Sequence, residues 1–410
     1  MDNIAGSPVE GENFFSREKD IARLREILEN DDILLLGPRR IGKTSIARAV
    51  MALLRAEGWR SIEINVASCV DERGFLDKLN ATLAPELNSL ADKARNAIGE
   101  ALTGVGKRIK SVKLPIPGAG SVGVDLTQAE EEDWTEVAND LLRLIAKAEQ
   151  RWLIYIDELP ILLFNIIRAD TQTGLQRVRR FLDWFRNDVR ALPEAGKVRW
   201  LVSGSVGLDT LVQQHGMADT INSLSHQSLD AFTEDVALAM LAKLAERYII
   251  DLPEKAAREL IVAVQWPQPY YIQAAFHHLR TLLAADATAT AAELIEQAID
   301  KLVQPGADND FHHWEARLTQ QLNTADAGHA LALLNRAARD PAGVRPETLL
   351  TGLEERMPNA TPEEAKRTFI HLRDILQRDA YWWPDESSGA RRYRFRLEPL
   401  RRWWLRRDTL

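Results

Sequence analysis

Residues 33–45 constrain this chain more than any other stretch, because they read as a strand, a glycine-rich turn and a helix in that order. Gly37 and Gly42 permit backbone conformations in which successive N–H groups point at phosphate oxygens. The helix that begins near Gly42 directs its positive end to the same place. The Lys43 amine can reach the β- and γ-phosphates, and the Thr44 hydroxyl suits Mg2+. The sequence therefore predicts a phosphate-binding loop formed by Gly37, Pro38, Arg39, Arg40, Ile41, Gly42, Lys43, Thr44 and Ser45.

Composition excludes several classes of protein. The 410 residues, 45% of them hydrophobic, suffice for two or three domains with buried cores. The single cysteine, Cys69, excludes an internal disulfide framework and cysteine-rich zinc sites. A polar N-terminal stretch, and the lack of any apolar run of 18 residues, argue against a signal peptide and a membrane span. We expect a cytoplasmic protein.

A second motif, which is acidic, points to hydrolysis of the bound nucleotide. The apolar run 152–156 ends in Asp157 and Glu158. At the end of a strand in a nucleotide-binding sheet, Asp157 would lie beside Mg2+ and Glu158 would polarise the attacking water. The alternative is a core strand with two acidic residues at its exposed end, but the preceding phosphate loop favours the catalytic interpretation. Ser203 follows another buried run, 198–202, and its hydroxyl can contact the attacking water or the γ-phosphate.

Two arginines are candidates for stabilising charge in the transition state. The predicted helix over residues 175–190 buries one apolar face and carries five arginines elsewhere, Arg186 and Arg190 among them. Such a group can act within its own chain or on a neighbouring subunit of a homo-oligomer. A solvated cationic face is an equal alternative.

The order of elements predicts an α/β core with a mostly parallel sheet, then an all-α lid, then a winged-helix domain. We place the core at residues 1–228, with a Gly- and Pro-rich insertion at about 104–127, the lid at 229–304 and the last domain at 305–410. The lid is predicted as helices at 236–248, 253–264, 269–284 and 289–302. The last domain is predicted as helices at about 311–322, 326–339 and 346–353, a helix capped by Thr361, and two strands near 381–383 and 393–397.

The C-terminal end is basic although the whole chain has a net charge of −8. Residues 391–410 contain eight arginines. Such a basic end can mark an anionic partner, or it can reflect a solvated surface and ion pairs within the chain. In a winged helix, Lys366 and Arg367 would lie on or near the recognition helix and Arg391 and Arg392 near the wing, where they could contact DNA phosphates. Winged helices also serve as protein-contact modules, so both kinds of partner stay open.

Several of these stretches together resemble one family. Residues 15–18, 37–45, 156–160, 202–205, 269–273 and 393–404 are similar to the prokaryotic AAA+/STAND-type ATPases often called archaeal-type ATPases. The resemblance implies a P-loop NTPase core, a helical lid and a winged helix, and it places Ser203 at the sensor-1 position and Pro269 at an adenine-side turn. Two positions depart from the family pattern, since Ser16 and Pro267 stand where glycine is usual.

Three functions follow as expectations. The first is an ATP-hydrolysing switch that binds ATP or ADP with Mg2+ and regulates an unidentified partner protein, as in defence or stress signalling. The second is a DNA-binding ATPase of the origin-recognition or transposition-regulator type. The third is a nucleotide-loaded scaffold with little turnover, which the lack of an unambiguous arginine finger motivates.

Overall fold

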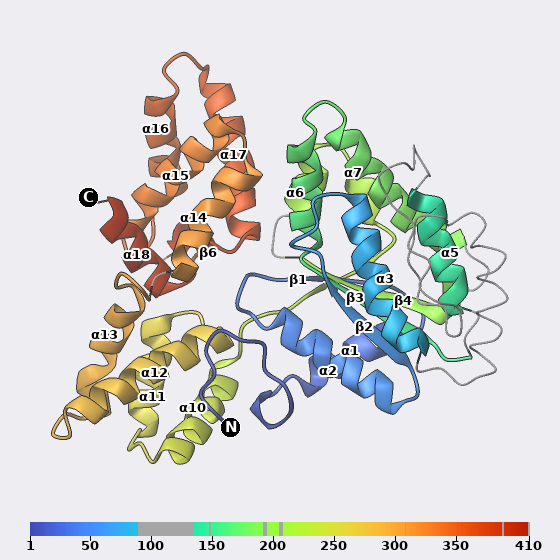
Figure 1. Ribbon diagram of the computed structural model, residues 1–410. Helices are drawn as coiled ribbons and strands as arrows, with labels where there is room; N and C mark the ends of the chain where they lie inside the picture. Colours follow the sequence, from blue (N-terminus) through green and yellow to red (C-terminus); the bar gives the residue numbers. More distant parts are fainter. Residues whose placement is uncertain are drawn as a thin grey trace. The chain divides into compact units, whose positions relative to one another are not determined.

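The computed structural model describes residues 1–88, 134–146, 149–191, 195–204, 208–307, 309–387 and 389–408 (Figure 1). The predicted insertion at 104–127 lies outside the described residues. The chain forms two compact units. The core unit comprises Arg17–Gly37 and Lys43–Leu229, and the C-terminal unit comprises Met1–Ser16, Pro38–Gly42 and Asp230–Leu410.

The core unit contains a five-stranded sheet in the order β2-β3-β4-β1-β5, with every neighbouring pair parallel, as predicted. Its strands are β1 Ile33–Leu36, β2 Arg60–Asn65, β3 Trp152–Asp157, β4 Val198–Ser203 and β5 Ser225–Ser228. The sequence analysis did not predict β5, because its residues Ser-His-Gln-Ser have no apolar pattern. Backbone pairing with β1 forms it instead. The parallel arrangement brings the carboxyl ends of β1, β3 and β4 to one edge.

Helices cover both faces of this sheet (Figure 1). On β3, Trp152, Ile154 and Ile156 belong to one hydrophobic cluster with residues of the helices that follow β2 and β3. Side chains alternate along a strand, so Leu153 and Tyr155 face the opposite side, where α2 packs. The helices are α1 Glu18–Leu28, α2 Lys43–Ala56, α3 Glu72–Asn88, α5 Trp134–Ala146, α6 Leu159–Ala169, α7 Gly174–Asp183, α8 Val189–Ala191 and α9 Leu208–Gln214.

The predicted helix over 175–190 is not one regular α-helix. Residues Trp184–Asp188 adopt π-helical winding between α7 and α8. Trp184 and Phe185 of this turn are both buried. Trp184 packs edge-on against Phe75 of α3 and Trp134 of α5.

The C-terminal unit contains the four lid helices at nearly the predicted positions. They are α10 Glu234–Tyr248, α11 Glu254–Val264, α12 Pro269–Ala285 and α13 Ala291–Leu302. We call α14 and everything after it the C-terminal segment, which comprises α14 Asn309–Gln321, α15 Thr324–Ala338, α16 Pro346–Arg356, α17 Pro362–Arg378, β6 Trp382–Asp385, β7 Arg392–Phe395 and α18 Glu398–Asp408.

The C-terminal segment has the winged-helix order of helices followed by a hairpin. Strands β6 and β7 pair antiparallel, and Val344 forms an isolated bridge to Tyr393 of β7. Helix α17 begins at the predicted cap, where the Thr361 side chain accepts from the Glu364 backbone N–H and the Glu364 carboxylate accepts from the Thr361 N–H. Helix α18 was not predicted. It buries Trp403 and Trp404, and the Trp404 indole donates to Asn335 of α15 at 2.7 Å.

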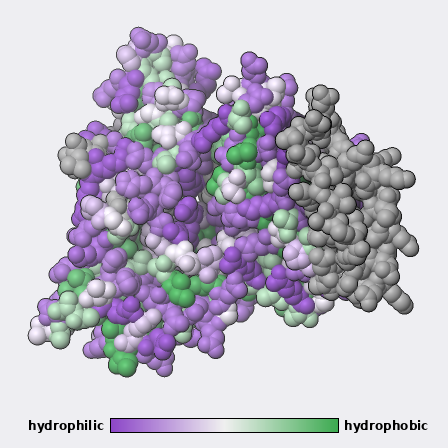
Figure 2. Space-filling view, viewed as in Figure 1, coloured by the Kyte–Doolittle hydropathy of each residue, from purple (hydrophilic) through white to green (hydrophobic). Residues whose placement is uncertain are grey.

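The surface is polar. On the face shown in Figure 2, hydrophobic residues form small groups among hydrophilic ones. No helix within the described ranges is both long and apolar enough to cross a membrane.

Candidate nucleotide-binding site

The phosphate loop follows β1 as predicted. Helix α2 begins at Lys43, directly after Gly42. Gly42 has φ +102°, a backbone conformation that side-chain-bearing residues rarely adopt, which explains the glycine. Helix α2 has no acidic residue in its first turn, so its positive end is not compensated from within the helix. Lys43 is buried, and its Nζ donates to the Gly37 carbonyl at 2.8 Å. The amine thus lies folded against the loop that precedes it.

Three predicted site residues meet at the carboxylate of Asp157. The Thr44 hydroxyl donates to Asp157 Oδ2 at 3.0 Å, and the Ser203 hydroxyl donates to Asp157 Oδ1 at 2.5 Å. Asp157 and Ser203 are both buried. The strand register explains this meeting, since Ile156 lies beside Val202 and the next residue on each strand is Asp157 and Ser203. A carboxylate with two hydroxyls offers the oxygen ligands that Mg2+ prefers, so these residues fit that ion.

Tyr155 completes this cluster and was missed by the sequence analysis. Its hydroxyl lies 3.0 Å from Ser203 Oγ. Burial, followed by the charge of Asp157, raises the pKa of Tyr155 above its ordinary value, so the phenol stays neutral. Tyr155 stands two positions before Asp157 and therefore on the same face of β3. That spacing was the available signal.

Glu158 lies at a strained turn. It has φ +62° and ψ +38°, the left-handed region, and immediately precedes α6, which has proline at its start. A non-glycine residue in this conformation costs about 1–2 kcal/mol and persists only where the surrounding structure holds it. Glu158 is half-buried, whereas Asp157 beside it is buried. The two acidic residues therefore have different environments, as different roles would require.

The structure does not bring Arg186 and Arg190 to this edge of the sheet. Arg186 pairs with Asp219 at 2.9 Å, and Arg190 lies 3.6 Å from Asp31 and 3.9 Å from Asp32. Asp31 and Asp32 precede β1, at the opposite end of that strand from the phosphate loop. Of the two roles considered above, only action on a neighbouring subunit stays as a prediction.

The predicted adenine-side turn contains a buried amide that the sequence analysis overlooked. Pro269 is the first residue of α12, and Gln268 before it is fully buried. Neither the Nε2 nor the Oε1 of Gln268 has a hydrogen-bond partner among the described residues. A buried unsatisfied amide is costly, so such a group in a native structure is a candidate for contact with a ligand.

The central loop residues make their own contacts inside the C-terminal unit. Arg40 has φ +70° and forms an ion pair with Asp310 at 2.7 Å. The sequence analysis included Arg40 as a loop residue but gave no role to Asp310, because 270 positions separate the two and only the tertiary fold joins them.

The residues predicted for DNA contact differ from one another. Lys366 and Arg367 lie exposed on α17. Arg391 pairs with Glu386 at 2.7 Å, and Arg392 donates to the Gly343 carbonyl at 2.8 Å. Two of these four residues, Arg391 and Arg392, therefore already make polar contacts within their own chain.

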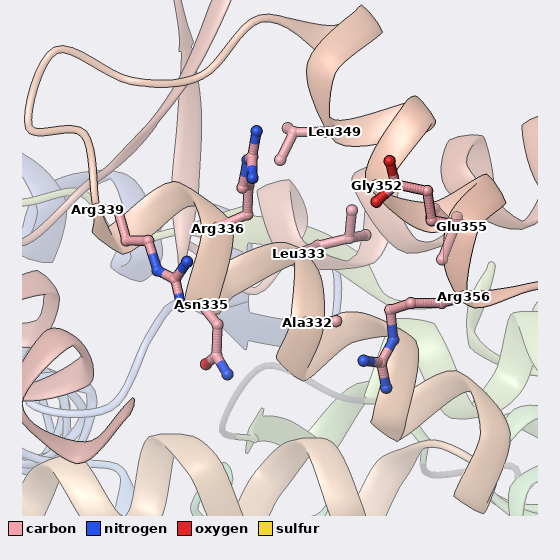
Figure 3. A pocket seen from close by; sticks show the side chains of 10 residues that line it. Ala332, Leu333, Asn335, Arg336, Arg339, Leu349, Gly352, Glu355 and Arg356 are labelled. Atoms are coloured by element: carbon pink, nitrogen blue, oxygen red, sulfur yellow. The ribbon is translucent and has the colours of Figure 1, made fainter. Parts of the chain in front are cut away.

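A cavity of about 350 Å3 lies elsewhere in the C-terminal segment, between α15 and α16 (Figure 3). Its lining combines leucines with three arginines, Arg336, Arg339 and Arg356, and one carboxylate, Glu355. This cavity is not part of the phosphate loop.

Comparison with known proteins agrees with this geometry. Residues 14–274 match the family described as "ATPase domain predominantly from Archaea". Among solved structures, a Walker-type ATPase of Pyrococcus abyssi is 16% identical, with a TM-score of 0.60 over 96% of this chain and 97% of that one. The ORC2 protein of Aeropyrum pernix, solved in ADPNP–ADP complexes, is 15% identical, with a TM-score of 0.55 over 97% of each chain. Comparison with curated proteins gives no match. The family match spans more than half of the chain, which therefore belongs to this family of ATPase domains.

Proposed function

We propose that the chain is an ATP-hydrolysing switch of the cytoplasm, whose nucleotide-dependent change of conformation regulates a partner protein. The observation that carries the proposal is the meeting of Thr44, Asp157 and Ser203 beside the phosphate loop, at one edge of the sheet. This arrangement belongs to a site for a metal-bound triphosphate rather than to a structural core, because it gathers hydroxyls and a carboxylate where an apolar strand ends.

Each residue then has a distinct task. The Lys43 amine exchanges the Gly37 carbonyl for a phosphate oxygen, and the backbone N–H groups of residues 39–45 hold the remaining phosphate oxygens. Thr44 and Asp157 would hold Mg2+, which supplies charge neutralisation when bound. Ser203 keeps Asp157 oriented. Glu158 accepts a proton from the water that attacks the γ-phosphorus, and ADP and phosphate leave. Pro269 and Gln268 are the candidates for contact with the base.

The test uses two variants with opposite consequences. Lys43→Ala is expected to abolish ATP binding, because the charge that offsets the phosphates is lost. Glu158→Gln is expected to keep binding and to lose turnover by about 100-fold or more, the usual contribution of a general base. Lys255→Ala, at an exposed site on α11, is the matched control. Equal ATP hydrolysis by Glu158→Gln and wild type would remove Glu158 as the base.

A second candidate is a DNA-binding ATPase. Its motivating observation is that Lys366 and Arg367 are exposed on α17, the last helix before the hairpin. Replacing both by alanine is expected to weaken binding to a duplex of any sequence and to lower the salt dependence of binding. Replacing Lys255 and Arg258 on α11 serves as the control with equal loss of charge. Absence of duplex binding by the wild type at low salt would reject this function.

The scaffold alternative rests on the ion pairs of Arg186 and Arg190. If neither acts on a neighbouring subunit, hydrolysis lacks an arginine that stabilises the transition state, and bound nucleotide turns over slowly. The ATPase rate measured over a range of protein concentrations distinguishes the two cases. A rate per subunit that rises with concentration indicates a homo-oligomer with an arginine acting between subunits, and a constant, very low rate indicates the scaffold.

A further inference from the structure

Arg40 of the phosphate loop is held from three sides within the C-terminal unit. Its Nε and Nη2 donate to Asp310 Oδ1 at 3.0 and 2.7 Å, and its Nη1 donates to the Gly6 carbonyl at 2.6 Å. The guanidinium also lies over the ring of Tyr270, 4.5 Å from its centroid. The contacts come from the N-terminal stretch, the lid and the C-terminal segment, so the tip of the loop is fixed by elements remote in sequence.

Asp310 is the centre of this arrangement. It is buried at the start of α14, where the helix dipole favours a negative charge. Arg39 Nε also lies 3.8 Å from its Oδ1. A buried carboxylate is strongly unfavourable unless it is paired, and the pairing here comes from two neighbouring residues of the phosphate loop. Burial alone would lower the pKa of Arg40, but the hydrogen bonds and charge of Asp310 raise it, so the guanidinium stays charged.

The ion pair between Arg40 and Asp310 holds an unusual backbone conformation at Arg40. A left-handed conformation at a residue with a long side chain costs about 1–2 kcal/mol. Arg40 adopts it at φ +70°, two positions before Gly42. The contacts of its guanidinium offset that cost. If they were removed, we expect the loop to relax toward ordinary backbone conformations.

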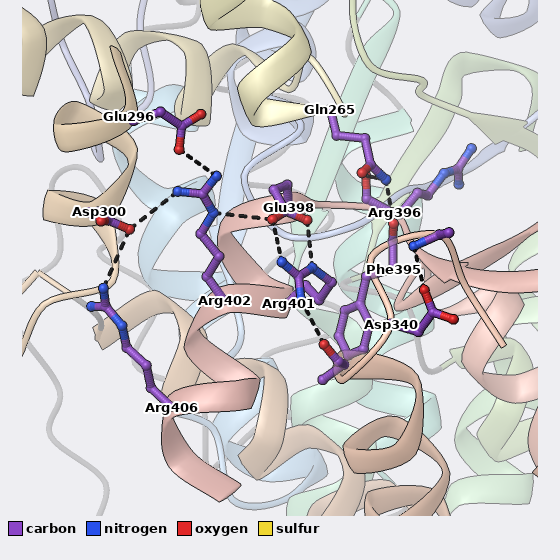
Figure 4. Close-up of polar contacts among 12 residues, drawn as sticks. Gln265, Glu296, Asp300, Asp340, Phe395, Arg396, Glu398, Arg401, Arg402 and Arg406 are labelled. Carbon is purple, nitrogen blue, oxygen red and sulfur yellow. Dashed lines mark hydrogen bonds and ion pairs between the residues drawn. The ribbon is translucent and has the colours of Figure 1, made fainter. Parts of the chain in front are cut away.

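Asp310 is also firmly joined to the lid. The next residue, Phe311, stacks on Tyr271 of α12 with ring centroids 5.8 Å apart and an interplanar angle of 8°. The Trp314 indole donates to the Tyr271 hydroxyl at 3.3 Å. At the other end of the segment, Arg402 of α18 pairs with Glu296 and Asp300 of α13 at 2.8 and 3.2 Å (Figure 4). These contacts join the lid to both ends of the C-terminal segment.

We propose that Asp310 is a positioning residue for the phosphate loop, acting through Arg40, and that it couples nucleotide binding to the C-terminal segment. The inference rests on the proposed function, since it assigns the regulation of the same site. Holding the loop in its binding conformation favours phosphate binding, because binding then does not have to order the loop at a cost in conformational entropy. By reciprocity, nucleotide in the loop strengthens the attachment of α14.

The first test measures ATP affinity and turnover separately. Asp310→Asn and Arg40→Gln are each expected to raise the Kd for ATP about tenfold and to change kcat less than threefold, since neither residue touches the reacting atoms. The double variant is expected to bind no more weakly than the worse single variant, because both changes break one interaction. Arg40→Lys, which keeps the charge, is expected to recover most of the affinity. Arg258→Gln, which breaks an exposed ion pair with Glu254 on α11, is the control. Unchanged affinity in Asp310→Asn, or simple multiplication of the two effects, would overturn the proposal.

The second test uses hydrogen exchange and separates this inference from the proposed function. Without nucleotide, exchange in residues 37–45 is expected to be faster in Asp310→Asn than in wild type, whether or not the protein is an ATPase. With saturating ATP, exchange in residues 309–321 is expected to slow in wild type and to stay unchanged in Arg40→Gln. Wild type that binds no ATP contradicts the proposed function alone. Equal exchange of the loop in Asp310→Asn and wild type contradicts the positioning role.

Discussion

Asp157 illustrates how much one side chain organises at the residue scale. Its two oxygens accept from hydroxyls of residues on α2 and β4, so a single carboxylate fixes the start of a helix relative to the ends of two strands. Such a buried acceptor is stable because both oxygens are satisfied and the carboxylate lies near the amino end of α2.

Gln268 gives a prediction at the same scale. Replacing it with methionine, a residue of similar volume, removes two unpaired buried groups and is expected to stabilise the nucleotide-free protein by about 1–2 kcal/mol. If the amide contacts adenine, it can donate and accept at the base edge, as glutamine does elsewhere, so the variant should also lose about 10-fold of its preference for ATP over GTP. Thermal denaturation and competition binding measure the two effects. A variant that is less stable and keeps its preference would show that the amide has only a packing role.

At the scale of elements, α18 is a helix that the sequence analysis did not predict. The sequence left open whether its arginines contact an anionic partner or make ion pairs within the chain, and in the structure Arg401 and Arg402 make ion pairs within the unit. Arg401 and Arg402 both donate to Glu398 in the first turn, and Arg402 also reaches α13 (Figure 4). Burial acts to raise the pKa of Glu398, but the hydrogen bonds and charges of these two guanidiniums outweigh it and hold the pKa below the ordinary value.

A pH dependence follows from Glu398. A carboxyl group whose pKa is lowered on folding contributes stability above its unfolded pKa of 4.5, and this contribution is lost as the pH falls through the lower, folded pKa. Glu398→Gln is expected to destabilise the protein by about 2 kcal/mol at pH 7, because two guanidiniums lose one charged partner. The difference from wild type should narrow below pH 4.5, and urea denaturation at both pH values measures it. Glu296→Gln, at the exposed end of the same network, should cost less than about 1 kcal/mol. Similar losses from the two changes would mean that burial does not matter here.

At the scale of the whole molecule, the chain is divided in an unexpected way. The lid and C-terminal segment form one compact unit with the N-terminal stretch and residues Pro38–Gly42 of the phosphate loop. The loop is thus shared in sequence between two units, since Gly37 and Lys43 belong to the other.

The proposed nucleotide site predicts that nucleotide stabilises the folded protein. ATP and Mg2+ at 100 times the Kd should stabilise the native protein by about 2.7 kcal/mol, because only the folded state binds them. The midpoint of thermal unfolding should therefore rise in wild type and Glu158→Gln and stay constant in Lys43→Ala. A rise of equal size in Lys43→Ala would mean that the ligand stabilises through another site.

The sequence by itself determined the elements whose signals are local. The sequence alone predicts such elements because each depends on neighbouring residues. They include the glycines and lysine of the phosphate loop, the apolar runs that end at Asp157 and Ser203, and the capped helix after Thr361. The helices of the lid are predicted from the sequence for the same reason. Only the tertiary structure decided the rest. It formed β5 from polar residues by pairing with β1, placed Tyr155 beside Ser203, and directed Arg186 and Arg190 to acidic partners away from the loop. It also joined Arg40 to Asp310. These features depend on strand order and on contacts between residues far apart in the chain, which no local pattern encodes.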